Sequence, residues 1–134
     1  MGAASSDFSD TKVLLYLLSA DPARAERAEA LIARGGWVSV QVLNEFASVA
    51  SRKLQMPIAE IREYLEPIRS IRVVVPVAAG THARGLDVAE RYGFSIFDSM
   101  IIAAALLAGC DTLYSEDLRH GQRIEGLVIR NPFK

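Results

Sequence analysis

The stretch over residues 94–122 reads FSIFDSMIIAAALLAGCDTLYSEDLRHGQ and decides the fold. It predicts a helix over 100–108 that is entered through Asp98, because the run is apolar and a glycine stops it. A short strand over 112–115 follows and delivers Asp117 just past its end. In an α/β sheet, the carboxyl edge of the strands is where functional sites lie. The stretch therefore predicts an α/β fold with acidic side chains at that edge.

Composition sets the broad class of the protein. The chain has 134 residues, of which 51% are hydrophobic and 23% charged, so it suits one globular domain with a single core. A net charge of -1 argues against binding nucleic acid by bulk charge, although it leaves room for a local basic patch. The lone Cys110 excludes a disulfide framework and a cysteine-based zinc site. No signal peptide or membrane-length apolar run is recognisable, so we expect a cytoplasmic protein.

The rest of the chain alternates short strands with longer helices. Expected strands cover 8–11, 37–40, 72–76 and 127–130, and expected helices cover 13–18, 22–35, 41–54, 58–70 and 78–92. We expect the strand over 72–76 to be buried and Pro67 to kink or shorten its helix. The alternation predicts a mainly parallel central sheet flanked by helices. Residues 1–7 are expected to form a flexible tail before a single domain over 8–134.

Four carboxylates are the candidate catalytic residues. Asp10, Glu45, Asp98 and Asp117 lie at a strand end, a helix start or a helix flank that this topology can turn toward one edge. Gathered carboxylates repel one another unless a cation joins them. Oxygen ligands without His or Cys suit Mg²⁺ or Mn²⁺ better than Zn²⁺. Such an ion can activate water and stabilise charge during phosphodiester hydrolysis.

Each of these acids also has a purely structural explanation. Asp98 and Asp10 can serve as helix caps, Asp117 can be a turn residue, and Glu45 can face solvent. Composition and periodicity leave these alternatives open.

Neighbouring polar residues are less informative. Thr11 and Ser115 either hydrogen-bond the carboxylates or are ordinary strand-end hydroxyls. Asp111 precedes its strand at the opposite edge, and strand alternation predicts that Glu116 points away from the face taken by Asp117. Neither acid is therefore a candidate.

Four short motifs together resemble the PIN-domain family. They are the runs FSDT followed by VLLY, VLNEF, FDSMI and LYSEDL, which begin at residues 8, 42, 97 and 113. The resemblance implies a three-layer α/β sandwich and a ribonuclease that depends on Mg²⁺ or Mn²⁺. It implies metal binding by Asp10, Asp98 and Asp117, with Glu45 supporting the ion or its water.

The compact size is similar to that of bacterial VapC-type toxins. That similarity implies the toxin component of a toxin–antitoxin system, with RNA as substrate, a cognate antitoxin protein as partner and a homodimer as assembly. Lys12 departs from the family pattern, because it stands where the family commonly has Asn. Its ammonium either helps to hold substrate phosphate or competes with the metal.

Two functional hypotheses follow. The first is metal-assisted hydrolysis of RNA, which the four ordered acids favour. The second, favoured by Lys12, is a catalytically weak or inactive PIN-like binding module that acts through dimerisation or a partner protein. A phosphoacceptor signalling domain lacks support, because acidic residues stand after the 112–115 strand where that class wants a Lys.

Overall fold

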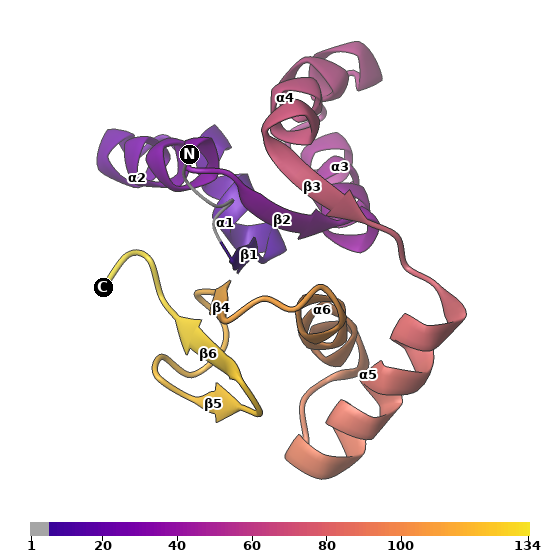
Figure 1. The fold of residues 1–134 in the computed structure, drawn as a ribbon. Coiled ribbons are helices and arrows are strands. Elements are labelled where there is room, and N and C mark those ends of the chain that lie inside the picture. Colours follow the sequence, from indigo (N-terminus) through magenta and orange to yellow (C-terminus); the bar gives the residue numbers. More distant parts are fainter. Residues whose placement is uncertain (1–5) are drawn as a thin grey trace.

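The computed structural model describes residues 6–134, which form one six-stranded sheet with helices packed against it (Figure 1). The strand order is β3-β2-β1-β4-β6-β5, and all neighbours pair in parallel except β5 with β6. The strands are β1 (Asp7–Ser9), β2 (Gly36–Ser39), β3 (Arg72–Val75), β4 (Thr112–Tyr114), β5 (Arg123–Ile124) and β6 (Leu127–Arg130). The predicted mainly parallel sheet of short strands is confirmed.

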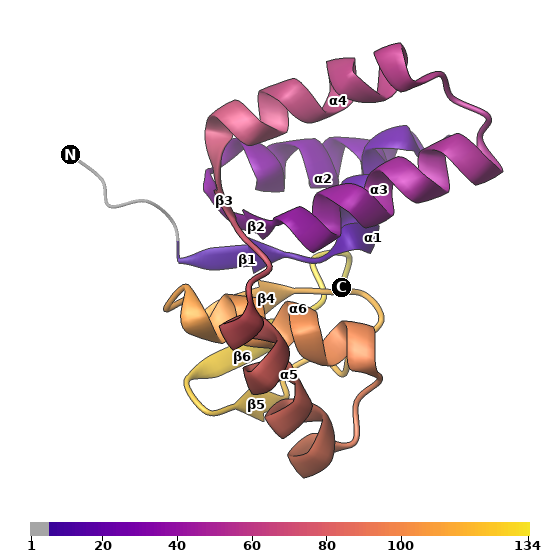
Figure 2. The same ribbon diagram turned by 90° about the vertical axis from the view of Figure 1, so that its right-hand side faces the viewer.

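The helices form two groups. They are α1 (Thr11–Leu15) with the 3-10 turn η1 (Tyr16–Leu18), α2 (Pro22–Ala33), α3 (Val40–Lys53), α4 (Ile58–Ile71), α5 (Ala79–Tyr92) and α6 (Ile96–Leu107). Figure 2 shows α2, α3 and α4 running side by side at one end of the molecule, with α5 and α6 at the other. None of the helices within residues 6–134 has both the length and the apolar character that crossing a membrane requires.

The centre of the sheet fixes where the functional edge lies. Phe8 of β1 pairs with Trp37 on one side and with Leu113 on the other. The chain passes directly from β1 and β2 into helices. Asp10 follows β1 and caps α1, and Ser39 is the last residue of β2 and caps α3. The carboxyl ends of β1, β2 and β4 therefore meet at one edge, as parallel pairing requires.

The core lies on both sides of this sheet. Fully buried side chains come from four adjacent strands and from the helices that cover them: Phe8, Val38, Leu113, Ile129, Phe46 and Ile102. Helix α6 is buried over most of its length, which explains why its sequence is apolar all round rather than striped.

The amino end of β1 holds a buried ion pair. Arg72 Nη1 lies 2.9 Å from Asp7 Oδ1, and both side chains are almost completely buried. Gly36 is packed against them with a φ of 126°, and a Cβ there would lie 2.6 Å from the Asp7 carbonyl oxygen. Residues 1–5 of the expected tail lie outside the described residues, whereas Asp7, at the end of that expected tail, is the first residue of β1.

Three local predictions differ from the structure. The strand expected to be buried is β3, but Val73 is 47% exposed because β3 lies at the edge of the sheet. Pro67 does not shorten α4, which continues for another turn to Ile71. The short strand β5 was not predicted, because two residues at the sheet's other edge leave no periodic signal.

Candidate active site

The carboxyl end of β1 presents Asp10, which is only 5% exposed. Its Oδ1 accepts a hydrogen bond of 2.6 Å from the backbone N–H of Thr11, and its Oδ2 accepts one of 2.9 Å from the hydroxyl of Ser115. The predicted capping role is therefore real. These two hydrogen bonds do not replace the full hydration that the carboxylate would have in water.

The pKa of Asp10 is raised to about 6, mainly by burial and to a smaller extent by the negative charges of Asp98 and Asp117. The hydrogen bonds from Ser115 and Thr11 act in the opposite direction, because they stabilise the ionised form. The charges of Asp98 and Asp117 therefore act on Asp10 as unfavourable neighbours of its ionised form.

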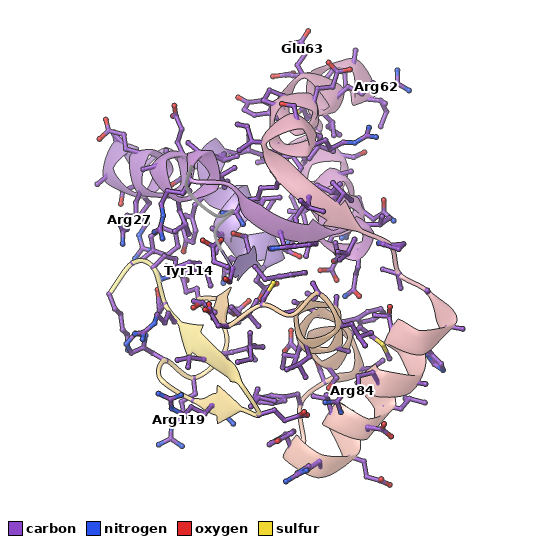
Figure 3. All side chains as sticks on the ribbon, in the orientation of Figure 1. Arg27, Arg62, Glu63, Arg84, Tyr114 and Arg119 are labelled. Atoms are coloured by element: carbon purple, nitrogen blue, oxygen red, sulfur yellow. The ribbon has the colours of Figure 1, made fainter. Side chains whose placement is uncertain are left out.

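Ser115 joins the ends of β1 and β4. Its backbone N–H donates to the Arg130 carbonyl at 2.9 Å, and the N–H of Asp10 donates to the Tyr114 carbonyl at 3.0 Å. The fully buried hydroxyl of Ser115 also accepts a bond of 3.3 Å from the N–H of Leu118. Ser115 thus orients Asp10 and shapes the turn that carries Asp117. Tyr114, labelled in Figure 3, marks this end of β4.

Glu45 reaches the site from the half-buried flank of α3, as its helical position predicts. Its Oε1 accepts a hydrogen bond of 2.6 Å from Thr11 Oγ1, and its Oε2 lies 3.4 Å from Gln41 Nε2. The same amide nitrogen donates to the Phe97 carbonyl at 3.1 Å. Glu45 is therefore held in place by residues on both sides of it, which contradicts the solvent-facing alternative.

Asp98 lies in the first turn of α6 but does not cap it. Ser95 is the N-cap, and its hydroxyl accepts a bond of 3.2 Å from the backbone N–H of Asp98. Because the cap is Ser95, α6 begins at Ile96, four residues before the expected start at residue 100. The half-buried Asp98 carboxylate is thus left available to the site.

Asp117 is more accessible, with 53% of its side chain exposed. Lys12 Nζ lies 3.1 Å from Asp117 Oδ1 and 3.8 Å from Glu116 Oε1. The hydrogen bond and charge of Asp117 raise the pKa of Lys12. The prediction that Glu116 points away from Asp117 is wrong, because Lys12 contacts both carboxylates. The chain bends after β4, so strand alternation no longer applies there.

Glu116 belongs to a cluster that sequence analysis missed. Tyr16 donates its hydroxyl to Glu116 Oε1 at 2.8 Å, and Arg24 Nη1 donates to Oε2 at 3.0 Å. The Arg24 guanidinium lies 5.0 Å from the Tyr16 ring centre and 5.3 Å from that of Phe133, and the two rings meet edge to face at 4.4 Å. No spacing rule links these residues, so no sequence signal would have found them.

The C-terminal segment is fixed against this cluster. Figure 3 shows Arg27 pointing from α2 toward that segment, and its Nε donates to the Pro132 carbonyl at 2.9 Å. The N–H of Phe133 donates to Asn131 Oδ1 at 2.9 Å. The last residues thereby help to define the wall of the site beside α1.

The structure places Asp10 just after β1, Asp117 in the loop after β4, Glu45 on α3 and Asp98 in the first turn of α6. Asp98 and Asp117 each raise the pKa of Asp10, and Thr11, which follows Asp10, donates a hydrogen bond to Glu45. Within residues 6–134, no group of three or more His, Cys, Asp or Glu side chains has the arrangement of a metal site.

Comparison with known proteins places the chain among its relatives. The PIN domain model matches residues 8–124. Mycobacterium tuberculosis VapC20, described as a Sarcin-Ricin loop cleaving toxin, has a similar structure with a TM-score of 0.68 and 22% identity over 83% of this chain and 89% of that one. A toxin–antitoxin complex from Klebsiella pneumoniae gives a TM-score of 0.69 and 18% identity over 94% of this chain and 97% of that one.

A third similar structure is VapBC2 from Rickettsia felis, which is bound to a DNA fragment from its promoter. It has a TM-score of 0.66 and 19% identity, and the match covers 93% of this chain and 97% of that one. No curated protein sequence matches the chain. The sequence model spans most of the chain and includes all four motifs, and the observed fold agrees with it, so this chain belongs to the PIN domain family.

Proposed function

We propose that this PIN-domain chain is a metal-dependent endoribonuclease and the toxin component of a toxin–antitoxin pair. The observation that carries the proposal is the environment of Asp10, a buried carboxylate whose pKa rises to about 6 through burial and through Asp98 and Asp117. Strongly perturbed acids in such surroundings are typical of catalytic sites.

The donor chemistry fits a hard divalent cation. Asp10, Glu45, Asp98 and Asp117 offer only carboxylate oxygens, which are the ligands that Mg²⁺ and Mn²⁺ prefer. A positive ion would also relieve the repulsion that Asp10 now experiences from its two neighbours. When bound, the ion would supply an activated water and charge stabilisation at the phosphodiester.

The chain's own residues prepare this site in two ways. Ser115 and Thr11 direct hydrogen bonds at Asp10 and Glu45, so these carboxylates keep one orientation before any ligand arrives. The Gln41 amide links Glu45 to the backbone at Phe97, next to Asp98, and so ties α3 to the start of α6. In the proposed hydrolysis, one carboxylate of the set accepts the proton of the attacking water.

The substrate and the partner are proposed from family membership together with the similar structures. Two of those structures are toxin–antitoxin assemblies, and VapC20 is described as cleaving the Sarcin-Ricin loop. We infer an RNA substrate and an antitoxin protein that blocks the site. A small neighbouring gene that relieves growth arrest caused by expression of this chain would identify the antitoxin.

Cleavage of assorted RNAs with Mn²⁺ tests the enzymatic proposal. Asp98→Asn removes one charge from the site and should abolish cleavage. Asp111→Asn is the matched control, because Asp111 is exposed at the opposite end of β4 and should leave cleavage unchanged. Equal cleavage by the wild type and the Asp98 variant would defeat the proposal.

We also propose that the protein forms a homodimer. A groove of about 720 Å³ lies between α3 and α6 and includes Val40, Val77, Ile96 and Phe97, whose side chains are exposed, Phe97 by 68%. Exposed apolar patches of this kind commonly mark interaction surfaces. Light scattering on the wild type and on Phe97→Asp measures the assembly, and an unchanged molar mass for the variant would exclude this groove as the interface.

A catalytically weak or inactive binding module is the second candidate. The favouring observation is the ion pair between Lys12 and Asp117, which places a protein cation on one of the proposed metal ligands. Calorimetry separates the two candidates, because the binding module predicts no heat with Mn²⁺ at millimolar concentration.

A further inference from the structure

Lys12 extends from the first turn of α1 to the loop after β4. Its ammonium contacts Asp117 Oδ1 at 3.1 Å, although the two residues are 105 positions apart. The side chain is 45% exposed, so its amine is free to adopt other positions in water. Ion pairs between exposed side chains are weak enough to open and close readily.

Glu116 does not explain why Lys12 lies there. Its two carboxylate oxygens already receive bonds from Tyr16 at 2.8 Å and from Arg24 at 3.0 Å, while Lys12 lies farther away at 3.8 Å. Among the side chains of residues 6–134, Lys12 is the one that donates a hydrogen bond to Asp117. The ammonium is therefore placed on Asp117 specifically.

An ammonium and a divalent cation that share the Asp117 carboxylate weaken each other's binding. Two positive charges in contact with one carboxylate oxygen repel strongly at such short range. Repulsion between the two cations therefore favours departure of the ammonium when Asp117 binds a metal ion. The ion pair and the proposed metal site thus form two alternative states of one carboxylate.

We propose that Lys12 is an internal counter-cation that contacts Asp117 and competes with the divalent metal, so that opening of the Lys12–Asp117 pair favours metal binding. This inference rests on the proposed metal-dependent function. The protein accordingly binds metal less tightly than its four carboxylates alone would allow.

Calorimetric titration of Mn²⁺ into the full chain measures this competition. Lys12→Met keeps the aliphatic stem and removes the charge, and it should lower the Kd for Mn²⁺ about three- to tenfold, the range expected for opening an exposed ion pair and removing a nearby charge. Lys53→Met is the matched control, because Lys53 is an exposed lysine at the far end of α3. Its Kd should match that of the wild type.

A second background distinguishes competition for Asp117 from a general effect of charge. In Asp117→Asn the carboxylate is gone, so Lys12→Met should change the Kd by less than about twofold. Undiminished tightening in this background would overturn the inference, as would unchanged affinity in the single Lys12 variant. If the wild type binds Mn²⁺ and only the Lys12 effect is missing, the inference alone fails. If neither protein binds Mn²⁺, the proposed function fails with it.

Discussion

The hydroxyl of Ser115 donates a hydrogen bond of 2.9 Å to Asp10, from the end of β4 to the end of β1. Both residues are buried, and the Ser115 hydroxyl stabilises the ionised form of Asp10 more than the backbone N–H of Thr11 does. The contact turns two separate strand ends into a single functional edge.

Replacing Ser115 by Ala should raise the pKa of Asp10 further above about 6, because the lost hydrogen bond favours the ionised form. Carbon-detected NMR titration of the Asp10 carboxyl without metal measures the change. Ser48→Ala, at an exposed position on α3, serves as the control and should leave the pKa of Asp10 unchanged. An unaltered Asp10 curve in the Ser115 variant would show that the hydroxyl does not support the charge.

The stability of the metal-free protein should depend on Asp10 in the mildly acidic range. The folded-state pKa of about 6 lies above the ordinary value of 3.8 for an aspartic acid, so the folded state binds the proton more tightly than the unfolded state does. The stabilisation that the folded state gains from this difference in the pKa of Asp10 is fully present below about pH 4. It is lost as the pH rises through about 6, by up to about 3 kcal/mol.

Urea unfolding with chelator between pH 4 and pH 7 tests this sign. The wild type should lose stability relative to Asp10→Asn as the pH rises, because the variant cannot ionise at this position. A difference between the two proteins that stays constant with pH would contradict a raised pKa in the folded state.

Gly36→Ala should destabilise the protein by more than about 3 kcal/mol, through overpacking and an unfavourable backbone conformation. A Cβ at this position would lie 2.6 Å from the Asp7 carbonyl oxygen, and the φ of 126° is disfavoured for alanine. Gly80→Ala in α5 is the matched control, since a Cβ there meets nothing within 4 Å and alanine favours helices. Thermal unfolding should separate the variants, and equal melting temperatures would contradict the predicted packing.

Phe133→Ala should loosen the cluster beside the site. It removes the edge-to-face contact with Tyr16 and one aromatic partner of Arg24, at a cost of about 1–2 kcal/mol. Phe94→Ala is a suitable comparison, because that ring also stacks on a tyrosine, Tyr92, but outside the site. Only the Phe133 variant should increase hydrogen–deuterium exchange of the backbone amides in the loop after β4, which carries Glu116. Equal exchange in both variants would argue against a supporting role for the C-terminal segment.

The sequence predicted the elements that have strong periodicity and the positions of two of the acids relative to those elements. Helices α2, α3 and α5 have clear apolar stripes and stop signals, and Asp10 and Glu45 lie where the order of strands and helices places them. The motifs around these acids also indicated the PIN domain family, which the family match confirms.

Features that depend on contacts between distant residues could not be predicted in this way. Ser95 rather than Asp98 caps α6, because either residue is a good cap and only the chain path decides. The exposure of Val73 follows from strand order, which hydropathy does not encode. Whether Lys12 contacts the site depends on a loop more than a hundred residues away.

The three-residue strand β1 carries a sequestered acid at each end, and the molecule treats them in opposite ways. Asp7 is balanced permanently by the Arg72 guanidinium, which is tethered to the neighbouring backbone through the Trp37 and Leu31 carbonyls. Within residues 6–134, Asp10 receives hydrogen bonds from neutral donors alone. The first aspartate therefore has a structural role, whereas the ionised form of the second would be stabilised by a cation bound at the site.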